Sequence, residues 1–215
     1  MKNLLYKELR LSLHPTMYLF LAMPAMLLIP SYPYYVAFMY TCLAVYFTFL
    51  FAREQNDIFY TAMLPIRKTD VVKGRFCSVV LFELLSFLIS IPFALLSVKI
   101  NPNGCNAAGI DPNLAFYGFA FIMVGVFNLI FMPEFYRTGH KLFRPMIFSA
   151  IFIFLYIAAA ETAAQYYPSP VSEFLDRPGI FSEHLPILIA GVVIYILATA
   201  AAYKISARQF EKVDL

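Results

Sequence analysis

The chain has 215 residues, of which 61% are hydrophobic and 13% are charged, and its formal net charge at pH 7 is +3. A soluble domain carries about 25% charged residues, so this composition excludes an ordinary soluble protein. A transmembrane helix needs roughly 20 apolar residues, and apolar stretches of that kind occupy more than half of the sequence. We therefore expect a single transmembrane domain over residues 1–215.

The positions of the cationic residues predict the topology of this domain. All but two of the sixteen Lys and Arg residues fall in alternate gaps between six apolar stretches. They are Lys2, Lys7, Arg10, Arg53, Arg67, Lys68, Lys73, Arg75, Arg137, Lys141, Arg144, Lys204, Arg208 and Lys212. Cationic flanks are retained on the cytoplasmic side of a bilayer, so we expect a multi-pass protein of the cell membrane with both termini in the cytoplasm. Because these cations set the orientation, the net charge gives no indication of a nucleic-acid partner.

The expected elements follow in chain order. Residues 1–14 alternate at helical spacing and suit a helix that lies in the inner membrane interface, ended by Pro15. The six expected spans cover about residues 16–30, 34–52, 76–98, 114–132, 145–164 and 185–203. Pro24 predicts a kink in the first span, Pro133 the end of the fourth and Pro186 the start of the sixth. We therefore expect an all-α membrane protein.

A cytoplasmic connection from Arg53 to Arg75 separates the second and third spans. Asp57 is a candidate cap for a short helix that Pro65 ends, and Thr69 is a candidate cap for the helix that enters the third span. The apolar residues of the short helix are Ile58, Phe59, Ala62 and Met63, and its charged flanks are Glu54, Asp57, Arg67 and Lys68. Such a helix can insert into a groove on a partner, with the charges orienting it. Alternatively, it is a plain interfacial helix in a positively charged loop.

Ionisable and amide side chains inside the spans are functional candidates, and here they are Glu83, Asn128 and Glu161. We expect Glu83 to pair with a cation on the cytoplasmic side or with polar backbone, rather than to relay protons. Glu161 is near the outer end of the fifth span, from which it can reach the headgroups. The second span presents Tyr35, Phe38, Tyr46 and Phe49, which either line a route for an amphipathic substrate or pack against other helices and lipid.

The sequence contains no phosphate-binding loop of the form Gly-x-x-x-x-Gly-Lys-Ser/Thr, so we expect no ATPase site in this chain. The three histidines, His14, His140 and His184, are far apart in the sequence and at span ends or in loops. We therefore expect no metal site, no catalytic residue and no cofactor in this chain.

Two regions resemble the ABC-2 type permeases, the membrane subunits of ATP-driven exporters with a six-span half. One is the amphipathic start Lys7-Glu8-Leu9-Arg10, and the other is the Glu-led loop that ends Leu64-Pro65-Ile66-Arg67-Lys68. The resemblance covers the whole chain in topology and is strongest in sequence between Arg53 and Arg75.

The resemblance implies a function and a set of partners. In that family the first cytoplasmic loop contains the coupling helix, which seats in a cleft of the ATPase subunit, so residues 57–64 correspond to that helix here. A separate ATPase would bind ATP and magnesium, and a second permease half, identical or related, would complete the pathway. The external stretch before the last span often holds short re-entrant helices, for which residues 171–175 are the candidate.

The cargo and the class of protein remain open at this stage. The outer loops leave no room for a substrate-capturing domain, which suits export of a membrane-embedded, amphipathic molecule. The resemblance implies a peptide, such as an antimicrobial peptide, or a lipid-like drug. Two alternatives come from other classes: an ion-coupled secondary transporter, and a membrane scaffold that transports nothing.

Overall fold

A computed structural model describes residues 2–8, 16–30, 32–63, 65–100, 110–138, 141–166 and 181–213. Within these residues the regular elements are all helical, which confirms the all-α prediction. The elements are α1 (Lys2–Lys7), α2 (Thr16–Phe20), the 3-10 helix η2 (Met23–Leu28), α3 (Tyr35–Glu54), α4 (Asp57–Ala62), α5 (Lys68–Ile100), α6 (Leu114–Thr138), α7 (Phe143–Tyr166) and α9 (Phe181–Glu211).

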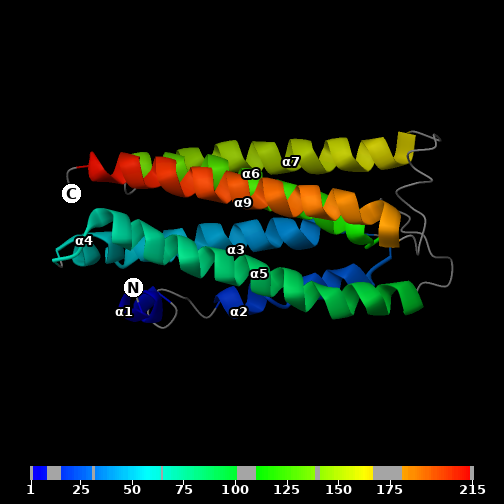
Figure 1. Ribbon diagram of the computed structural model, residues 1–215. Helices are drawn as coiled ribbons and strands as arrows, with labels where there is room; N and C mark the ends of the chain where they lie inside the picture. Colours follow the sequence, from blue (N-terminus) through cyan, green and yellow to red (C-terminus); the bar gives the residue numbers. More distant parts are fainter. Residues whose placement is uncertain are drawn as a thin grey trace.

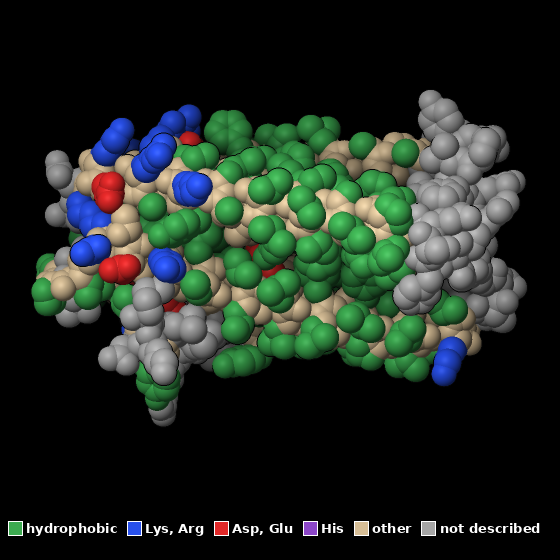
Figure 2. Space-filling view, viewed as in Figure 1, with side chains coloured by type: hydrophobic (Ala, Val, Ile, Leu, Met, Phe, Trp, Pro, Cys, Tyr) green, Lys and Arg blue, Asp and Glu red, His purple; other side chains and the backbone are tan. Residues whose placement is uncertain are grey.

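The long helices run side by side along one axis, and both chain termini lie at the same end of the bundle as α1 and α4 (Figure 1). We call this end the basic end, because terminal turns of all five long helices carry a cation there. These residues are Arg53, Lys68, Arg137, Arg144 and Arg208. Figure 2 shows Lys and Arg gathered at this end and a broad hydrophobic surface beyond it. The bundle thus has the charge distribution that the alternating gaps predicted.

Five helices are long and apolar enough to cross a membrane, and they match the second to sixth expected spans. They are Tyr35–Glu54, Lys68–Ile100, Leu114–Thr138, Phe143–Ala163 and His184–Glu211. The first expected span is a shorter apolar stretch, Thr16–Leu28. The architecture is therefore five full-length spans and one short apolar segment.

The short segment changes helix type at Pro24. A proline ring collides with the carbonyl of the residue four positions earlier, here Phe20, where α2 ends. The chain continues as the 3-10 helix η2, in which Ala25 N donates to Ala22 O over 3.0 Å. The expected kink is therefore a break between two helix types.

The segment nevertheless traverses the bundle. Before it, Lys7 lies beside Asp57 and Thr61 at the basic end, and after it, Tyr34 Oη lies 3.1 Å from Ser97 Oγ in the last turns of α5. Arg75, which also binds Asp57, and Ser97 are 22 residues apart on α5 (97 − 75), so the distance covered is about 33 Å. That distance is comparable with a hydrocarbon core of about 30 Å, so the separation of its two ends is compatible with a sixth crossing by this segment.

Two proline predictions were wrong. Pro133 does not end the fourth span, since α6 continues through it to Thr138. Pro186 is inside α9, which begins at Phe181. Within membrane helices, neighbouring helices and local adjustment compensate for the missing donor of a proline, so a proline is a weak boundary signal there. The candidate re-entrant helix at residues 171–175 lies outside the described residues.

The closest helix packing joins α6 to α9. A Cβ atom on Gly118 would lie 2.6 Å from the Ile187 carbonyl oxygen, and one on Gly125 would lie 2.9 Å from the Tyr195 Cα. A Cβ atom on Gly191 would collide with the Gly118 backbone. Small residues let two membrane helices approach to backbone contact, and here they are contributed by both helices.

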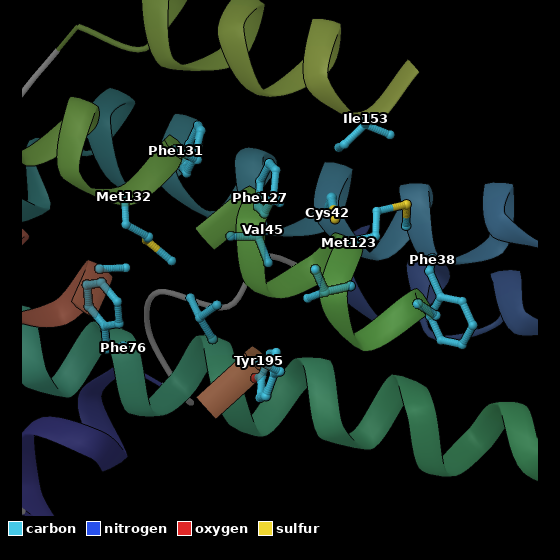
Figure 3. Close-up of a cluster of buried hydrophobic side chains, with 14 of the residues drawn as sticks. Phe38, Cys42, Val45, Phe76, Met123, Phe127, Phe131, Met132, Ile153 and Tyr195 are labelled. Atoms are coloured by element: carbon cyan, nitrogen blue, oxygen red, sulfur yellow. The ribbon is translucent and has the colours of Figure 1, made fainter. Parts of the chain in front are cut away.

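The core lies between this pair and the helices α3 and α5. Figure 3 shows Cys42 and Val45 of α3, Met123 and Phe127 of α6, and Tyr195 of α9 meeting in one cluster of buried side chains. The packing of α7 is looser, since only 11% of its span is buried. The core therefore fixes α3, α5, α6 and α9 relative to one another, and these helices position the site described next.

Candidate functional site

The short helix α4 forms the connection between α3 and α5 at the basic end (Figure 1). The turn that starts it has Asn56 in the left-handed region, with φ 52° and ψ 28°. Asparagine tolerates this conformation better than most residues. The prediction that Asp57 caps α4 was therefore wrong, because Asp57 is the first helical residue. Thr69, the other predicted cap, likewise lies inside the first turn of α5.

The Asp57 carboxylate instead joins three helices. Its Oδ1 lies 2.6 Å from Lys7 Nζ of α1, and its Oδ2 lies 2.5 Å from Arg75 Nη2 of α5. The residue after α1, Glu8, completes the set, with Oε2 2.8 Å from Arg75 Nε. Lys7 Nζ also donates to Thr61 Oγ1 over 2.6 Å. We call Lys7, Glu8, Asp57 and Arg75 the charge network.

The charge network is largely withdrawn from solvent. Arg75 and Glu8 are both buried, and the Arg75 guanidinium carbon lies 5.7 Å from the centroid of the Phe49 ring. An arginine fork suits two carboxylates at once, which a lysine cannot match. Removing one member of a buried ion pair leaves an unpaired charge, which is strongly destabilising. The network therefore fixes α4 relative to α1 and α5.

The apolar residues expected to dock on a partner divide between two faces of α4. Ile58 is only 7% exposed and belongs to the hydrophobic core. Phe59 is 39% exposed and Met63, which follows the helix, is 80% exposed. Tyr60, which the sequence analysis did not select, is 68% exposed. We call Phe59, Tyr60 and Met63 the exposed α4 surface; the side chain of Ala62 lies outside the description.

The expected charged flanks also differ in their surroundings. Glu54 and Arg67 are exposed beside α4. Lys68, by contrast, is partly buried and donates from Nζ to the Val213 carbonyl oxygen over 2.7 Å. Lys68 therefore ties the end of the chain after α9 to the start of α5, in addition to any role toward a partner.

The intramembrane candidates Glu83 and Asn128 meet, whereas Glu161 lies apart on α7. Asn128 Nδ2 donates to Glu83 Oε2 over 3.0 Å, and Tyr195 Oη donates to the same oxygen over 2.7 Å. The expectation that Glu83 pairs with a cation or with backbone was wrong, because its hydrogen-bond donors are the side chains of Asn128 on α6 and Tyr195 on α9. We call Glu83, Asn128 and Tyr195 the buried polar cluster.

The aromatic residues of the second span pack inside the protein. Tyr35, Phe38 and Phe49 are buried, and Tyr46 is half-buried. The Phe38 ring stacks on Phe87 of α5 with centroids 4.3 Å apart. Helix packing, rather than a substrate route, accounts for these side chains.

Four residues of the site were not predicted from the sequence: Lys7, Glu8, Arg75 and Tyr195. Lys7 and Arg75 were interpreted only as topology signals, and Glu8 only as part of an amphipathic start. A signal was nevertheless present, since an acid follows a cation in a segment expected to lie on the membrane. In the part of the chain that the structure covers, no cluster of three or more His, Cys, Asp or Glu side chains could hold a metal; His14 and His140 lie outside it.

The comparisons with known proteins give one match. No curated protein and no solved structure matches the chain. Residues 3–211 match the family described as ABC-2 family transporter protein. The match begins before α1 is complete and ends with α9, so it includes the charge network, α4 and all of the spans. The chain is thus a permease that belongs to the ABC-2 family of transporter proteins.

Proposed function

We propose that this permease exports an amphipathic substrate and is driven by a separate ATPase subunit that docks on α4. The observation that carries the proposal is the combination of an exposed apolar surface with a rigid attachment. Phe59, Tyr60 and Met63 project from a helix whose Asp57 is anchored to α1 and α5. A short helix of this kind suits a groove on a protein partner.

The same contacts supply a route for the mechanical step. Displacement of α4 by a docked ATPase would pull on Arg75 through Asp57 and so act directly on α5. It would act on α3 through the turn at Asn56 and on α1 through Lys7. ATP and magnesium would be bound by the ATPase, and movement of α3 and α5 would open a pathway to the outside.

The proposed assembly contains two permease halves, identical or related, and two ATPase subunits in the cell membrane. Both termini and α4 would then face the cytoplasm, as the positive-inside rule requires for the basic end. The chain between α5 and α6 and between α7 and α9, residues 101–113 and 167–180, has 13 and 14 residues, too few for a substrate-capturing domain. Connections of this length suit extraction of a membrane-embedded peptide or lipid-like drug better than capture of a soluble substrate.

The test is co-purification of a cytoplasmic ATPase from native membranes in mild detergent. Phe59→Asp and Met63→Asp place a charge on the exposed α4 surface, and we expect each to reduce the recovered ATPase at least tenfold while the permease still inserts. Phe143→Asp is the matched control, because Phe143 is 77% exposed at the basic end but belongs to α7. It should retain the ATPase.

Three outcomes would contradict the proposal. Normal ATPase recovery with both α4 variants would show that α4 is not the docking element. An absence of ATPase with the wild-type protein, combined with substrate efflux that collapses with the proton gradient, would favour an ion-coupled carrier. Loss of the ATPase without any change in substrate flux would favour a membrane scaffold.

A further inference from the structure

The buried polar cluster brings together three helices inside the membrane. Glu83 of α5 and Asn128 of α6 are both fully buried, and Tyr195 of α9 is nearly so. Asn128 Nδ2 also lies 3.4 Å from Thr199 Oγ1 of α9. One carboxylate oxygen, Glu83 Oε2, accepts both short hydrogen bonds. The other, Glu83 Oε1, has no hydrogen-bond partner among the described residues, and neither does Asn128 Oδ1.

No cation balances this carboxylate within the described part of the chain. The described ion pairs of Lys and Arg are with Glu8, Asp57 and Glu134. The nearest network cation along α5 is Arg75, eight residues away (83 − 75), or about 12 Å along the helix axis. Arg75 is already occupied by Glu8 and Asp57.

The other titratable groups around Glu83 are a thiol and a phenol, neither of which can supply a positive charge. Cys42 of α3 interacts with it electrostatically, and Tyr195 donates to it from α9. The 3-10 helix η2, which also packs on α5, contains only apolar residues. At the basic end of α5, α1 and α4 contribute charges to the charge network and not to Glu83.

A lone carboxylate in such surroundings is costly, because burial removes its hydration and nothing of opposite charge replaces it. Proton binding removes the charge. It forms one O–H bond on Glu83 Oε1 with a proton taken from water, and Oε2 keeps the hydrogen bonds from Tyr195 and Asn128. The free oxygen is therefore where a proton fits.

We propose that Glu83 is an intramembrane proton-binding site, which carries its proton at neutral pH and as a neutral carboxyl holds α5 against α6 and α9. The site is independent of ATPase docking on α4. Its ligand is a proton, for which one unpartnered carboxyl oxygen is sufficient, and no group of three or more His, Cys, Asp or Glu side chains among the described residues could hold a metal ion there.

The experiment is infrared spectroscopy of the purified full-length permease in lipid nanodiscs at pH 7. A protonated carboxyl has a carbonyl stretch separate from that of a carboxylate, and an exposed glutamate is ionised at this pH because its ordinary pKa is about 4.3. We expect a protonated-carboxyl band that Glu83→Gln abolishes. Glu54→Gln is the control, since Glu54 is exposed, and it should leave the band unchanged.

A second variant assigns the band if Glu83→Gln does not fold. Tyr195→Phe removes one hydrogen bond to the carboxyl and little else, so it should move the band to higher frequency. Glu161→Gln identifies any protonated-carboxyl band that belongs to Glu161 on α7, so that it is not assigned to Glu83. A wild-type spectrum without this band would overturn the proposal, and so would a band that neither Glu83→Gln nor Tyr195→Phe alters. An ionised Glu83 would then require a metal cation or water as its partner.

Discussion

At the scale of single residues, Arg75 combines contacts from three other helices or their flanks. Its guanidinium binds Asp57 of α4 and Glu8 after α1, and it lies over the Phe49 ring of α3. All of these interactions are in a low-dielectric environment, where an unpaired charge is far more costly than in water. The position of α4 therefore depends on the identity of this one side chain.

We expect Arg75→Ala to destabilise the protein by about 3–5 kcal/mol, because it leaves buried Glu8 and partly buried Asp57 with Lys7 as their one remaining described cation. The corresponding fall in Tm is on the order of 10 °C. The stability of Arg75→Lys should lie between that of the wild type and that of Arg75→Ala, since one ammonium group cannot satisfy both carboxylates in the same way. Thermal unfolding in detergent measures the change.

Lys73→Ala is the matched control for this prediction, because Lys73 is an exposed cation on the same helix. A surface substitution of this kind changes stability by no more than about 0.5 kcal/mol. Equal effects of the two alanine variants would show that the charge network does not stabilise the fold.

The α4 residues illustrate what the sequence could predict at this scale. Ile58 and position 62 are four residues apart and share one helix face, and so are Phe59 and Met63 on another. The sequence analysis grouped all four as one apolar surface because the loop gives no indication of which face meets the core. The orientation of α4 is set by the left-handed turn at Asn56 and by the ion pairs of Asp57 with Lys7 and Arg75. In this orientation Ile58 is buried and Phe59 is exposed.

At the scale of elements, α6 and α9 form the tightest pair, through backbone contact at Gly118, Gly125 and Gly191. The helix α7 also contains several small residues. Ala158, Ala159 and Ala163 of α7 are exposed, however, so small size alone did not identify the contact. A small residue permits close packing but does not determine which helix approaches.

We expect Gly191→Leu to separate α6 from α9, since any Cβ at this position collides with the Gly118 backbone. Overpacking of this kind costs about 1–3 kcal/mol or more, because backbone cannot move aside as a side chain can. Size-exclusion chromatography of a fluorescent fusion should show loss of the monodisperse peak.

The neighbouring residue provides the control. Ala190 is exposed on the same helix, so Ala190→Leu adds a larger side chain without meeting α6. If both leucine variants elute like the wild type, the contact between Gly118 and Gly191 does not limit packing.

At the scale of the whole molecule, the alternation of cations predicted the arrangement of the helices well. It predicted that α4 and both termini lie at one end, and the five full-length spans follow one another in the expected order (Figure 1). The ends of helices were less predictable, because prolines at 133 and 186 are accommodated within α6 and α9. Contacts between distant segments, such as Lys68 with Val213, could not be predicted from local pattern.

If Thr16–Leu28 is a sixth crossing, both termini lie on the same side of the membrane. We expect reporter proteins fused to either end to be active only in the cytoplasm, with a fusion in residues 101–109 active only outside as the opposite control. Five crossings would place the termini on opposite sides. Different locations for the two terminal reporters would therefore show that Thr16–Leu28 does not cross the membrane.

The change of helix type at Pro24 has a consequence for the lipid around this segment. A 3-10 helix rises about 2.0 Å per residue against about 1.5 Å for an α-helix, so the six residues of η2 gain about 3 Å of reach. Even so, the first crossing remains the shortest of the bundle, while the helix facing it, α5, has 33 residues. Hydrophobic mismatch in a thicker bilayer would therefore strain this segment before the others. The N-terminal part of the permease should accordingly be sensitive to the acyl-chain length of the surrounding lipid.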